Sequence, residues 1–222
     1  MLIGLFDSGS GGLNTVRYIK ESAKDVDLRY VIDRNNAPYG IKSEKELIEI
    51  SEANIAYLTD MGCERVLIAC CTASTVHGKL KEKYKKASIP IIDAVAKAAR
   101  RASQNGRIGV IATNYTVSSH AFGNALGEYT REMSLSDLVE MIDCGLSDRT
   151  ATENDVITLE KMLLPILQKD IDTLILGCTH FSSVRKTVSY IAKRYGVTNI
   201  IDSAKEGALL LADTSDKRTR NK

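Results

Sequence analysis

Short β-rich apolar runs alternate with longer amphipathic runs along the whole chain, and this alternation limits the possible fold more than any other feature. Parallel strands need a crossover between them, usually a helix, so the pattern predicts an α/β protein with parallel sheets and helices on both faces. The clearest helical segment covers residues 43–61, and Gly62 is placed to end it. We expect eight strands, at residues 2–6, 28–32, 65–69, 90–92, 107–112, 138–142, 173–176 and 199–201.

Size and composition are those of an ordinary soluble protein. The 222 residues suffice for one large domain or two small ones, and the net charge of +2 gives no reason to expect a nucleic-acid partner. The chain shows no signal peptide and no run near the ~18 apolar residues of a membrane helix, so we expect a cytoplasmic protein without a membrane partner. The odd number of cysteines, five, predicts free thiols in a reducing compartment.

The sequence around Cys70 resembles the sequence around Cys178. RVLIACCT at 65–72 and DTLILGCT at 172–179 each continue a buried-type strand into a small residue, a cysteine and a nearby threonine. The two cysteines lie about half a chain length apart, as two similar α/β halves would place them. Ligands of open α/β sheets bind at the carboxyl ends of the strands, so we expect the two thiols to face each other across one cleft.

Two thiols on opposite sides of a ligand suit the inversion of a Cα centre. One group removes the Cα proton from one face, and the other returns a proton to the opposite face. Cysteine can alternate between thiolate and thiol near neutral pH if its pKa is lowered, and a helix N-terminus after the strand favours the thiolate. The simpler interpretation of a cysteine is a buried core residue, and we expect this for Cys63 and Cys144.

A glycine-rich turn, GLFDSGSGG at residues 4–12, follows the first expected strand. Its backbone N–H groups could hold a carboxylate or a phosphate. It departs from the dinucleotide-binding fingerprint because Asn14 stands where the last glycine should be. Within the turn, Asp7 could take or orient a proton, and a helix N-cap is an equally good interpretation of this residue.

The three histidines differ in their expected roles. His180 follows Cys178 closely enough to assist that thiol. His77 and His120 lie within helical patterns, and we expect them to be structural. We expect no metal site, because the cysteines and histidines lack the paired spacings of zinc ligands.

Four motifs together resemble those of the aspartate/glutamate racemase family, and of glutamate racemases in particular. They are FDSGSGGL at 6–13, PYG at 38–40 followed by KS at 42–43, ACCTA at 69–73, and LGCTH at 176–180. The segments IGVIAT at 108–113 and DS at 202–203 also fit, so the resemblance extends over nearly the whole chain.

The resemblance implies a fold, a reaction and an assembly. The fold is two doubly wound parallel-sheet domains related by pseudo-twofold symmetry, residues 1–93 plus 204–222 and residues 94–203, with the active site at their interface. The reaction is racemisation of L-glutamate to D-glutamate, a precursor of cell-wall peptidoglycan, without pyridoxal phosphate, metal or nucleotide. The assembly is a homodimer.

The same resemblance assigns roles to individual residues. Cys70 and Cys178 are the paired catalytic bases, assisted by Asp7 and His180 respectively. Hydroxyl groups and the backbone of the PYG motif would hold the carboxylates and the ammonium group of the substrate. The expected substrate-binding residues are Asp7, Ser8, Pro38, Tyr39, Gly40, Cys71, Thr72, Thr113 and Thr179.

Two positions depart from the family pattern and leave alternatives open. Cys71 stands where the family has asparagine, and a thiol cannot replace the donors of an amide. Asp143 stands where the family has a glutamate, after the strand expected at 138–142. The alternatives to a glutamate racemase are an aspartate racemase, a non-catalytic amino-acid-binding homologue, and a nucleotide-binding enzyme that uses the turn at 7–12.

Overall fold

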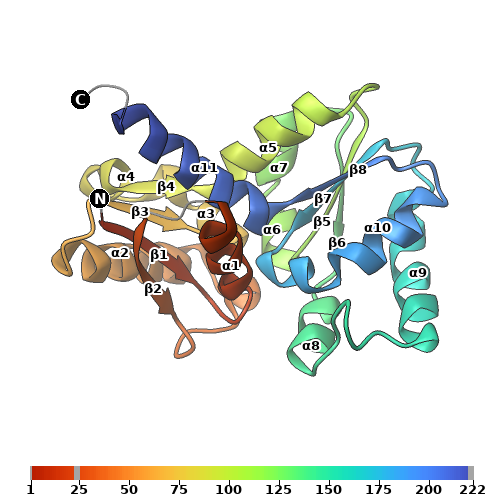
Figure 1. The fold of residues 1–222 in the computed structure, drawn as a ribbon, viewed down its shortest axis with the longest axis horizontal. Coiled ribbons are helices and arrows are strands. Elements are labelled where there is room, and N and C mark those ends of the chain that lie inside the picture. Colours follow the sequence, from red (N-terminus) through yellow and green to blue (C-terminus); the bar gives the residue numbers. More distant parts are fainter. Residues whose placement is uncertain (1, 23–25, 220–222) are drawn as a thin grey trace.

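The computed structural model describes residues 2–22 and 26–219, which form two four-stranded parallel sheets side by side (Figure 1). The first sheet has the order β2-β1-β3-β4, with β1 (Leu2–Asp7), β2 (Asp27–Ile32), β3 (Arg65–Ile68) and β4 (Ser88–Pro90). The second sheet has the order β6-β5-β7-β8, with β5 (Ile108–Ala112), β6 (Arg131–Ser134), β7 (Thr173–Gly177) and β8 (Asn199–Asp202). The prediction of an α/β fold with parallel sheets is confirmed.

The two sheets repeat one topology. In each, the first strand of the half lies at the centre, between the second and the third, and the fourth strand lies at the far edge. Strand β1 therefore corresponds to β5, and β3 corresponds to β7, with every strand pair parallel. The repeat places the ends of β3 and β7, which precede Cys70 and Cys178, at equivalent positions in the two halves.

Helices and short turns connect the strands. Those that follow strands of the first sheet are α1 (Gly12–Ser22), η1 (Tyr39–Ile41), α2 (Glu44–Asp60), α3 (Cys71–Ser74), η2 (His77–Lys79), α4 (Glu82–Ala87) and α5 (Ile91–Ala102). Those that follow strands of the second sheet are α6 (Asn114–Ser118), α7 (Ala121–Leu126), α8 (Asp137–Asp143), α9 (Glu153–Leu167), η3 (Thr179–Val184), α10 (Arg185–Lys193) and α11 (Ser203–Thr219). Helix α11 returns from the second sheet to pack along α1 and α5 (Figure 1).

Helix α2 has the boundaries that its sequence predicts. The Ser43 side chain accepts a hydrogen bond from the backbone N–H of Glu46, and the Glu46 side chain accepts one from the backbone N–H of Ser43. This capping box satisfies two backbone donors at the helix N-terminus. Gly62 adopts a φ of 86° just beyond the C-terminus, in the left-handed region that favours glycine.

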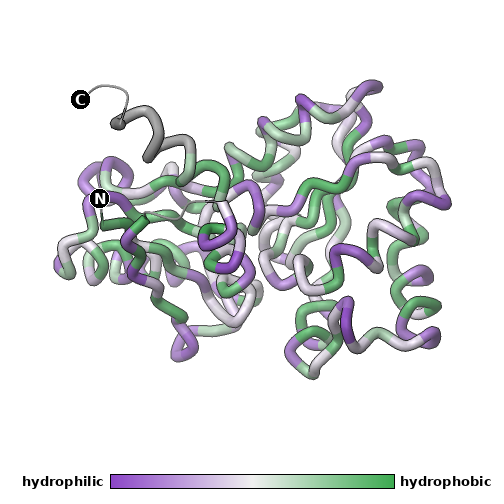
Figure 2. Tube along the Cα trace, in the orientation of Figure 1, coloured by the Kyte–Doolittle hydropathy of each residue, from purple (hydrophilic) through white to green (hydrophobic). Residues whose placement is uncertain are grey.

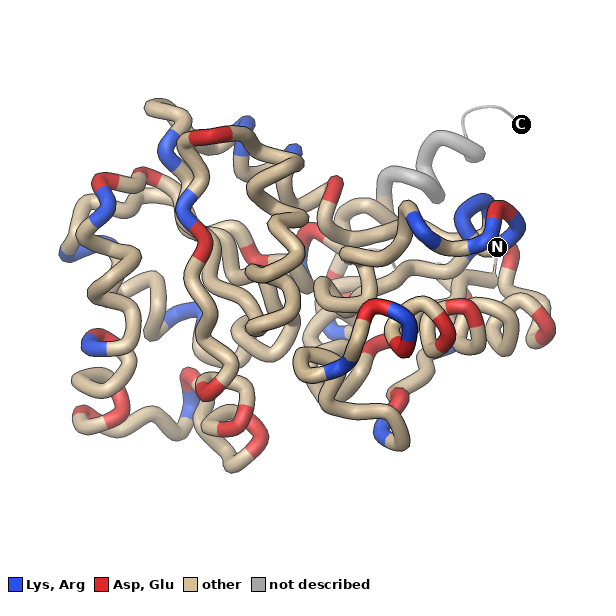
Figure 3. The backbone as a smooth tube through the Cα atoms, turned by 180° about the vertical axis from the view of Figure 1, so that it is seen from behind, with Lys and Arg blue, Asp and Glu red and all other residues tan. Residues whose placement is uncertain are grey.

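Apolar side chains of the strands pack beneath the helices and form the core of each half. All five residues of β7 are buried, as are the last five of β1, and the strands stand out as hydrophobic in Figure 2. Acidic and basic residues are interspersed over both halves of the described chain, as Figure 3 shows from behind. No helix in the described ranges is long and apolar enough to cross a membrane.

Two of the eight expected strands are wrong in whole or in part. Residues 138–142 belong to helix α8, and the strand at that place in the sheet is β6, which lies earlier in the chain. Because β6 is a short edge strand with partly exposed side chains, its sequence REMS carries no apolar alternation. The strand expected at 90–92 ends at Pro90, since Ile91 already begins α5 and turns its side chain into the core.

The cysteines are all free thiols, as the sequence predicts. Cys63 is buried in the core of the first half, which confirms the prediction for this residue. The same prediction is wrong for Cys144, which is exposed because it caps the C-terminus of α8 in a surface turn.

Candidate active site

A cavity lies between the two halves at the carboxyl ends of their central strands. Its lining combines the turn after β1, the segment before and within η1, the residues after β3 and β5, the end of β7 with the residues after it, and helix α8. The members are Ser8, Gly9, Ala37, Pro38, Tyr39, Gly40, Cys70, Cys71, Thr72, Thr113, Val139, Asp143, Gly177, Cys178, Thr179 and His180. Every expected site residue lines this cavity except Asp7, which is fully buried and contacts three of the lining residues. Residues from distant parts of the sequence thus meet at one place.

Asp7 ends β1 and receives hydrogen bonds from both halves. Its Oδ2 accepts one from the Thr179 hydroxyl at 3.0 Å, and its Oδ1 accepts one from the backbone N–H of Gly9 at 3.3 Å. Burial raises the pKa of Asp7, while His180 and these hydrogen bonds act in the opposite direction. The result is a carboxyl group that can hold a proton more readily than an exposed aspartate.

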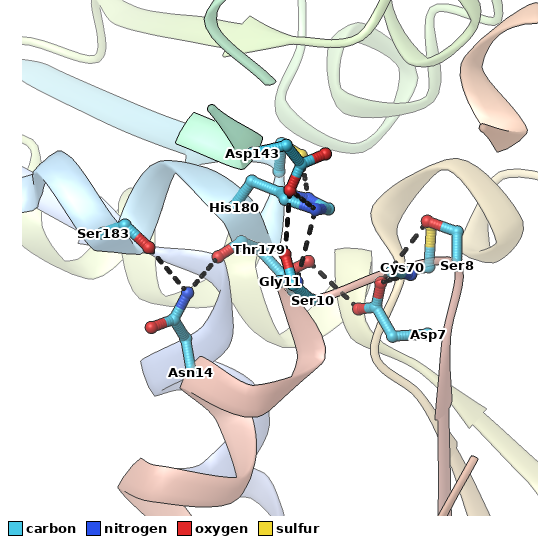
Figure 4. A network of polar contacts seen from close by, with 12 residues as sticks. Asp7, Ser8, Ser10, Gly11, Asn14, Cys70, Asp143, Thr179, His180 and Ser183 are labelled. Carbon is cyan, nitrogen blue, oxygen red and sulfur yellow. Dashed lines mark hydrogen bonds and ion pairs between the residues drawn. The ribbon is translucent and has the colours of Figure 1, made fainter. Parts of the chain in front are cut away.

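Cys70 follows β3 by one residue and caps the N-terminus of α3. Its Sγ lies 3.6 Å from the hydroxyl oxygen of Ser8, and the same hydroxyl donates to Asp7 at 3.4 Å, so Ser8 bridges the thiol and the carboxyl group (Figure 4). Burial, and then the nearby charge of Asp7, raise the pKa of Cys70 from 9.0 to about 11. The thiol is therefore protonated at neutral pH.

Cys178 follows β7 directly and caps η3, so it occupies the matching position in the second half. Its Sγ lies 3.6 Å from Nδ1 of His180. Nε2 of His180 accepts a hydrogen bond from the backbone N–H of Gly11 at 3.3 Å, so the neutral ring carries its proton on Nδ1 and directs it at the sulfur. Burial raises the pKa of Cys178, and the charges of Cys70 and Asp7 act in the same direction.

Asp143 connects α8 to the turn after β1. Its Oδ1 accepts a hydrogen bond from the Ser10 hydroxyl at 2.9 Å and lies 3.6 Å from Nε2 of His180 (Figure 4). On the neighbouring side, the Asn14 side chain donates to the backbone oxygen of Thr179 at 3.0 Å. These contacts join the two halves around the histidine.

Three threonine hydroxyls form a triangle, and two of these threonines, Thr72 and Thr113, line the cavity. Oγ1 of Thr72 lies 2.9 Å from Oγ1 of Thr113 and 3.1 Å from that of Thr116, and the last two lie 2.9 Å apart. Each hydroxyl has one proton, so a bound acceptor would redirect one or more of these bonds. Such a group can hold a carboxylate with hydroxyl donors from both halves.

Cys71 is a third thiol in the same cavity. It is the first residue of α3 and is 2% exposed. Burial raises its pKa well above the ordinary value, and the neighbouring Cys178 and Cys70 act in the same direction. At neutral pH it therefore presents a neutral, weakly polar group where an amide would present two donors.

The glycine-rich turn packs against protein in this structure. A Cβ atom at Gly11 would collide with Thr179 and His180, and one at Gly12 would collide with Tyr30. Gly11 thus allows the close approach of the two halves, and Gly12 allows α1 to pack against Tyr30 within the first half. The backbone N–H groups of Gly9 and Gly11, which a phosphate would need, already bond to Asp7 and His180. This packing argues against the nucleotide-binding alternative.

Two residues of the site were not expected from the sequence: Thr116, which bonds to two of the lining threonines, and Val139, which lines the cavity itself. Thr116 follows Thr113 at a spacing of three residues in the first turn of α6, where the Thr113 side chain caps the helix, and that spacing was an available signal. Val139 lines the cavity from α8, which the sequence analysis took for a strand. Among the described residues, no group of three or more His, Cys, Asp and Glu side chains could hold a metal ion.

The fold and the paired thiols lead to one class of enzyme, the racemases. Residues 9–211 match the family described as Asp/Glu/Hydantoin racemase, and the chain belongs to this family. Among its relatives is the glutamate racemase of Persephonella marina, which is 37% identical over 216 residues, 95% of this chain and 81% of that protein.

Solved structures of glutamate racemases share the fold. A glutamate racemase isoform from Bacillus anthracis superimposes with a TM-score of 0.84 at 27% identity. The superposition covers 98% of this chain and 82% of the Bacillus anthracis chain. The Escherichia coli glutamate racemase in complex with L-glutamate and the activator UDP-MurNAc-Ala superimposes with a TM-score of 0.74 at 26% identity, over 95% of this chain and 80% of its own.

Proposed function

We propose that this protein interconverts L- and D-glutamate by moving the Cα proton between the thiols of Cys70 and Cys178, without a cofactor. The observation that carries the proposal is that the two thiols follow equivalent strands of the two halves and line one cavity. Binding of an amino acid alone requires no such pair, so the arrangement favours an enzyme over a non-catalytic binding homologue.

The proton balance of the reaction closes within the cavity. In one direction, the Cys70 thiolate removes the Cα proton and becomes a thiol, while the Cys178 thiol protonates the opposite face of the carbanion and becomes a thiolate. In the reverse direction the two residues exchange roles. The total number of protons and the net charge stay constant, so the reaction needs no external acceptor.

Neighbouring groups supply the thiolate that starts the reaction. The substrate ammonium group brings a positive charge into the cavity and lowers the pKa of a nearby thiol. Ser8 bridges Cys70 and Asp7, so the thiol proton can pass to the buried carboxyl group. The Nδ1 proton of His180 lies next to Cys178 and stabilises the thiolate there.

Hydroxyl and backbone donors from both halves hold the substrate carboxylates. Tyr39 and Gly40 are the first residues of η1, so their N–H groups have no partner inside that turn and can bind an anion. The remaining proposed substrate contacts are Ser8, Pro38, Cys71, Thr72, Thr113 and Thr179, which all line the cavity. The relatives named above support glutamate rather than aspartate as the substrate.

The proposal extends to the organisation of the chain. We assign residues 1–93 and 204–222 to one domain and residues 94–203 to the other, because helix α11 returns to pack on α1. The family resemblance supports a homodimer in solution, which light scattering would measure.

Proton NMR in D₂O tests the proposed reaction directly. The pure protein is incubated with L-glutamate and, separately, with L-aspartate, and the α-proton signal and the optical rotation are followed. Loss of both signals with glutamate supports the proposal, and faster loss with aspartate would show that aspartate is the preferred substrate.

Cys70→Ala and Cys178→Ala should each abolish racemisation, whereas Cys63→Ala, which removes a thiol outside the cavity, should retain it. Full racemisation by either of the first two variants contradicts the two-thiol reaction.

A further inference from the structure

One wall of the cavity is held in place by a polar network whose other members, Asp33, Asn36 and Asn54, lie outside the cavity lining. Ala37, Pro38, Tyr39 and Gly40 form this wall, here called the 37–40 wall. The Tyr39 side chain is 1% exposed and belongs to the hydrophobic core of the first half. Its hydroxyl donates a hydrogen bond to Oδ2 of Asp33 at 2.7 Å. The position of the wall is therefore coupled to that carboxylate.

Asp33 gathers donors from three segments of the chain. Besides Tyr39, the Asn36 side chain lies 2.9 Å from both carboxylate oxygens, and the Asn54 side chain of α2 donates to Oδ2 at 3.0 Å. The Asn54 side chain also reaches the Tyr39 hydroxyl at 3.3 Å. The backbone N–H of Asp33 donates to the backbone oxygen of Asp7 at 2.9 Å. The network thus connects the 37–40 wall to α2 and to the strand that carries Asp7.

The carboxylate of Asp33 is charged at neutral pH although it is buried. Burial by itself raises the pKa of this group, but the hydrogen bonds from Tyr39, Asn54 and Asn36 outweigh that effect and leave the pKa lowered. Hydrogen bonds to a charged acceptor are shorter and stronger than those between neutral groups. The Tyr39 hydroxyl is accordingly held in one place.

We infer that Asp33 is a positioning residue for substrate binding, which acts through the Tyr39 hydroxyl to fix the 37–40 wall relative to Cys70. This inference rests on the proposed function, and it states that the hydrogen-bond network around Asp33 increases the affinity of the site for its substrate. A wall that holds a substrate group away from the reacting Cα stabilises the ground state and the transition state alike. Loosening it raises KM and leaves kcat nearly unchanged.

Two substitutions test the inference against a matched control. Tyr39→Phe removes only the hydroxyl, and Asp33→Asn removes the charge but keeps an acceptor. Tyr57→Phe is the control, because this tyrosine lies on α2 with a 55% exposed side chain. A hydrogen bond to a charged group contributes on the order of tenfold or more to a binding equilibrium, so both test variants should raise KM for L-glutamate by about that factor. The control should leave KM and kcat as in the wild type.

A double variant separates positioning from general destabilisation. Asp33→Asn weakens and Tyr39→Phe removes the same hydrogen bond, so the double variant should raise KM no more than the stronger single variant. Additive effects on KM, an unchanged KM in Tyr39→Phe, or a fall in kcat at constant KM would each overturn the inference.

Amide hydrogen exchange distinguishes this inference from the proposed function, because it requires no turnover. The peptide covering residues 34–42 should exchange faster in both test variants than in the wild type or in Tyr57→Phe. Unchanged exchange contradicts the inference even if the wild type racemises glutamate. If the wild type racemises no amino acid, the proposed function fails, and exchange still decides whether Asp33 fixes the wall.

Discussion

Gly11 lies where the two halves touch, and a methyl group at this position should force them apart. A Cβ atom there would lie 2.6 Å from Nδ1 of His180 and 2.7 Å from its backbone nitrogen, and would also collide with the Thr179 hydroxyl. Ordinary contacts of a Cβ atom begin at 3.4 Å, so in Gly11→Ala the backbone nitrogen of His180 must move away by about 0.7 Å and take η3 with it. A close-packed interior cannot absorb the overlap in another way.

This displacement acts on the groups proposed to transfer protons. Thr179 bonds to Asp7, and His180 lies next to Cys178, so both thiols lose their alignment. A misplacement near 1 Å can cost on the order of 10²-fold in rate, and we expect kcat/KM to fall by about 10- to 100-fold. Overpacking costs about 1–3 kcal/mol of unfolding free energy, which lowers the melting temperature by about 2–12 °C in a chain of this size.

Steady-state racemisation of L-glutamate, followed by circular dichroism, measures the effect at a temperature where both proteins are folded. Gly78→Ala is the matched control, because no described atom lies within 4 Å of a Cβ atom at that position. Gly9→Ala should fall between the two, since its Cβ atom would meet the His180 ring at 3.2 Å. Wild-type kcat/KM in Gly11→Ala, or an equal loss in Gly78→Ala, would refute the packing argument.

Further predictions concern stability and the weaker contacts of the site. Burial raises the pKa of Cys70 from 9.0 to about 11, so the unfolded chain loses this proton first. The free energy of unfolding should then fall by about 1–3 kcal/mol as the pH rises from 9 to 11, and urea titrations should show a smaller fall in Cys70→Ala. Asp143→Ala should lower kcat/KM by no more than about fivefold, because the half-exposed contact to Ser10 is screened by solvent; a hundredfold loss in steady-state kinetics would contradict this. Ser43→Ala removes a capping box and should lower the melting temperature by about 2–4 °C, with racemisation unchanged; an unaltered thermal melt would show that the cap contributes nothing.

Much of the fold follows from local patterns in the sequence. Strands β1, β3, β5 and β7 are central and buried, so their apolar runs stand out from the flanking polar residues. The capping box at Ser43 and the glycine at position 62 likewise act on their nearest neighbours, which is why the boundaries of α2 were predictable. Edge strand β6 lacks such a pattern, because its side chains are partly exposed and neighbouring strands, rather than its own residues, stabilise it.

The position of the two cysteines in the fold was predictable for a related reason. Cys70 follows a central strand by one residue and Cys178 follows one directly, so a general rule for parallel sheets places each at the carboxyl edge of its sheet. Glycines at 11 and 12 were recognisable as a turn, but their purpose was not, since the sequence suggested a bound anion and the structure shows close packing against Thr179 and Tyr30.

The sequence alone determined the α/β class, the central strands, and the two thiols at their ends. These features depend on residues within a few positions of one another, whose periodicity and spacing are visible in the chain itself. The tertiary structure alone decided that Ser10 meets Asp143 across 133 positions, that Thr116 completes the hydroxyl triangle, and that Asp33 holds the Tyr39 hydroxyl. The first two contacts depend on how two separately formed halves pack together, and the third depends on how the chain folds back after β2. In each case a shift of about 1 Å makes or breaks a hydrogen bond and leaves no local trace in the sequence.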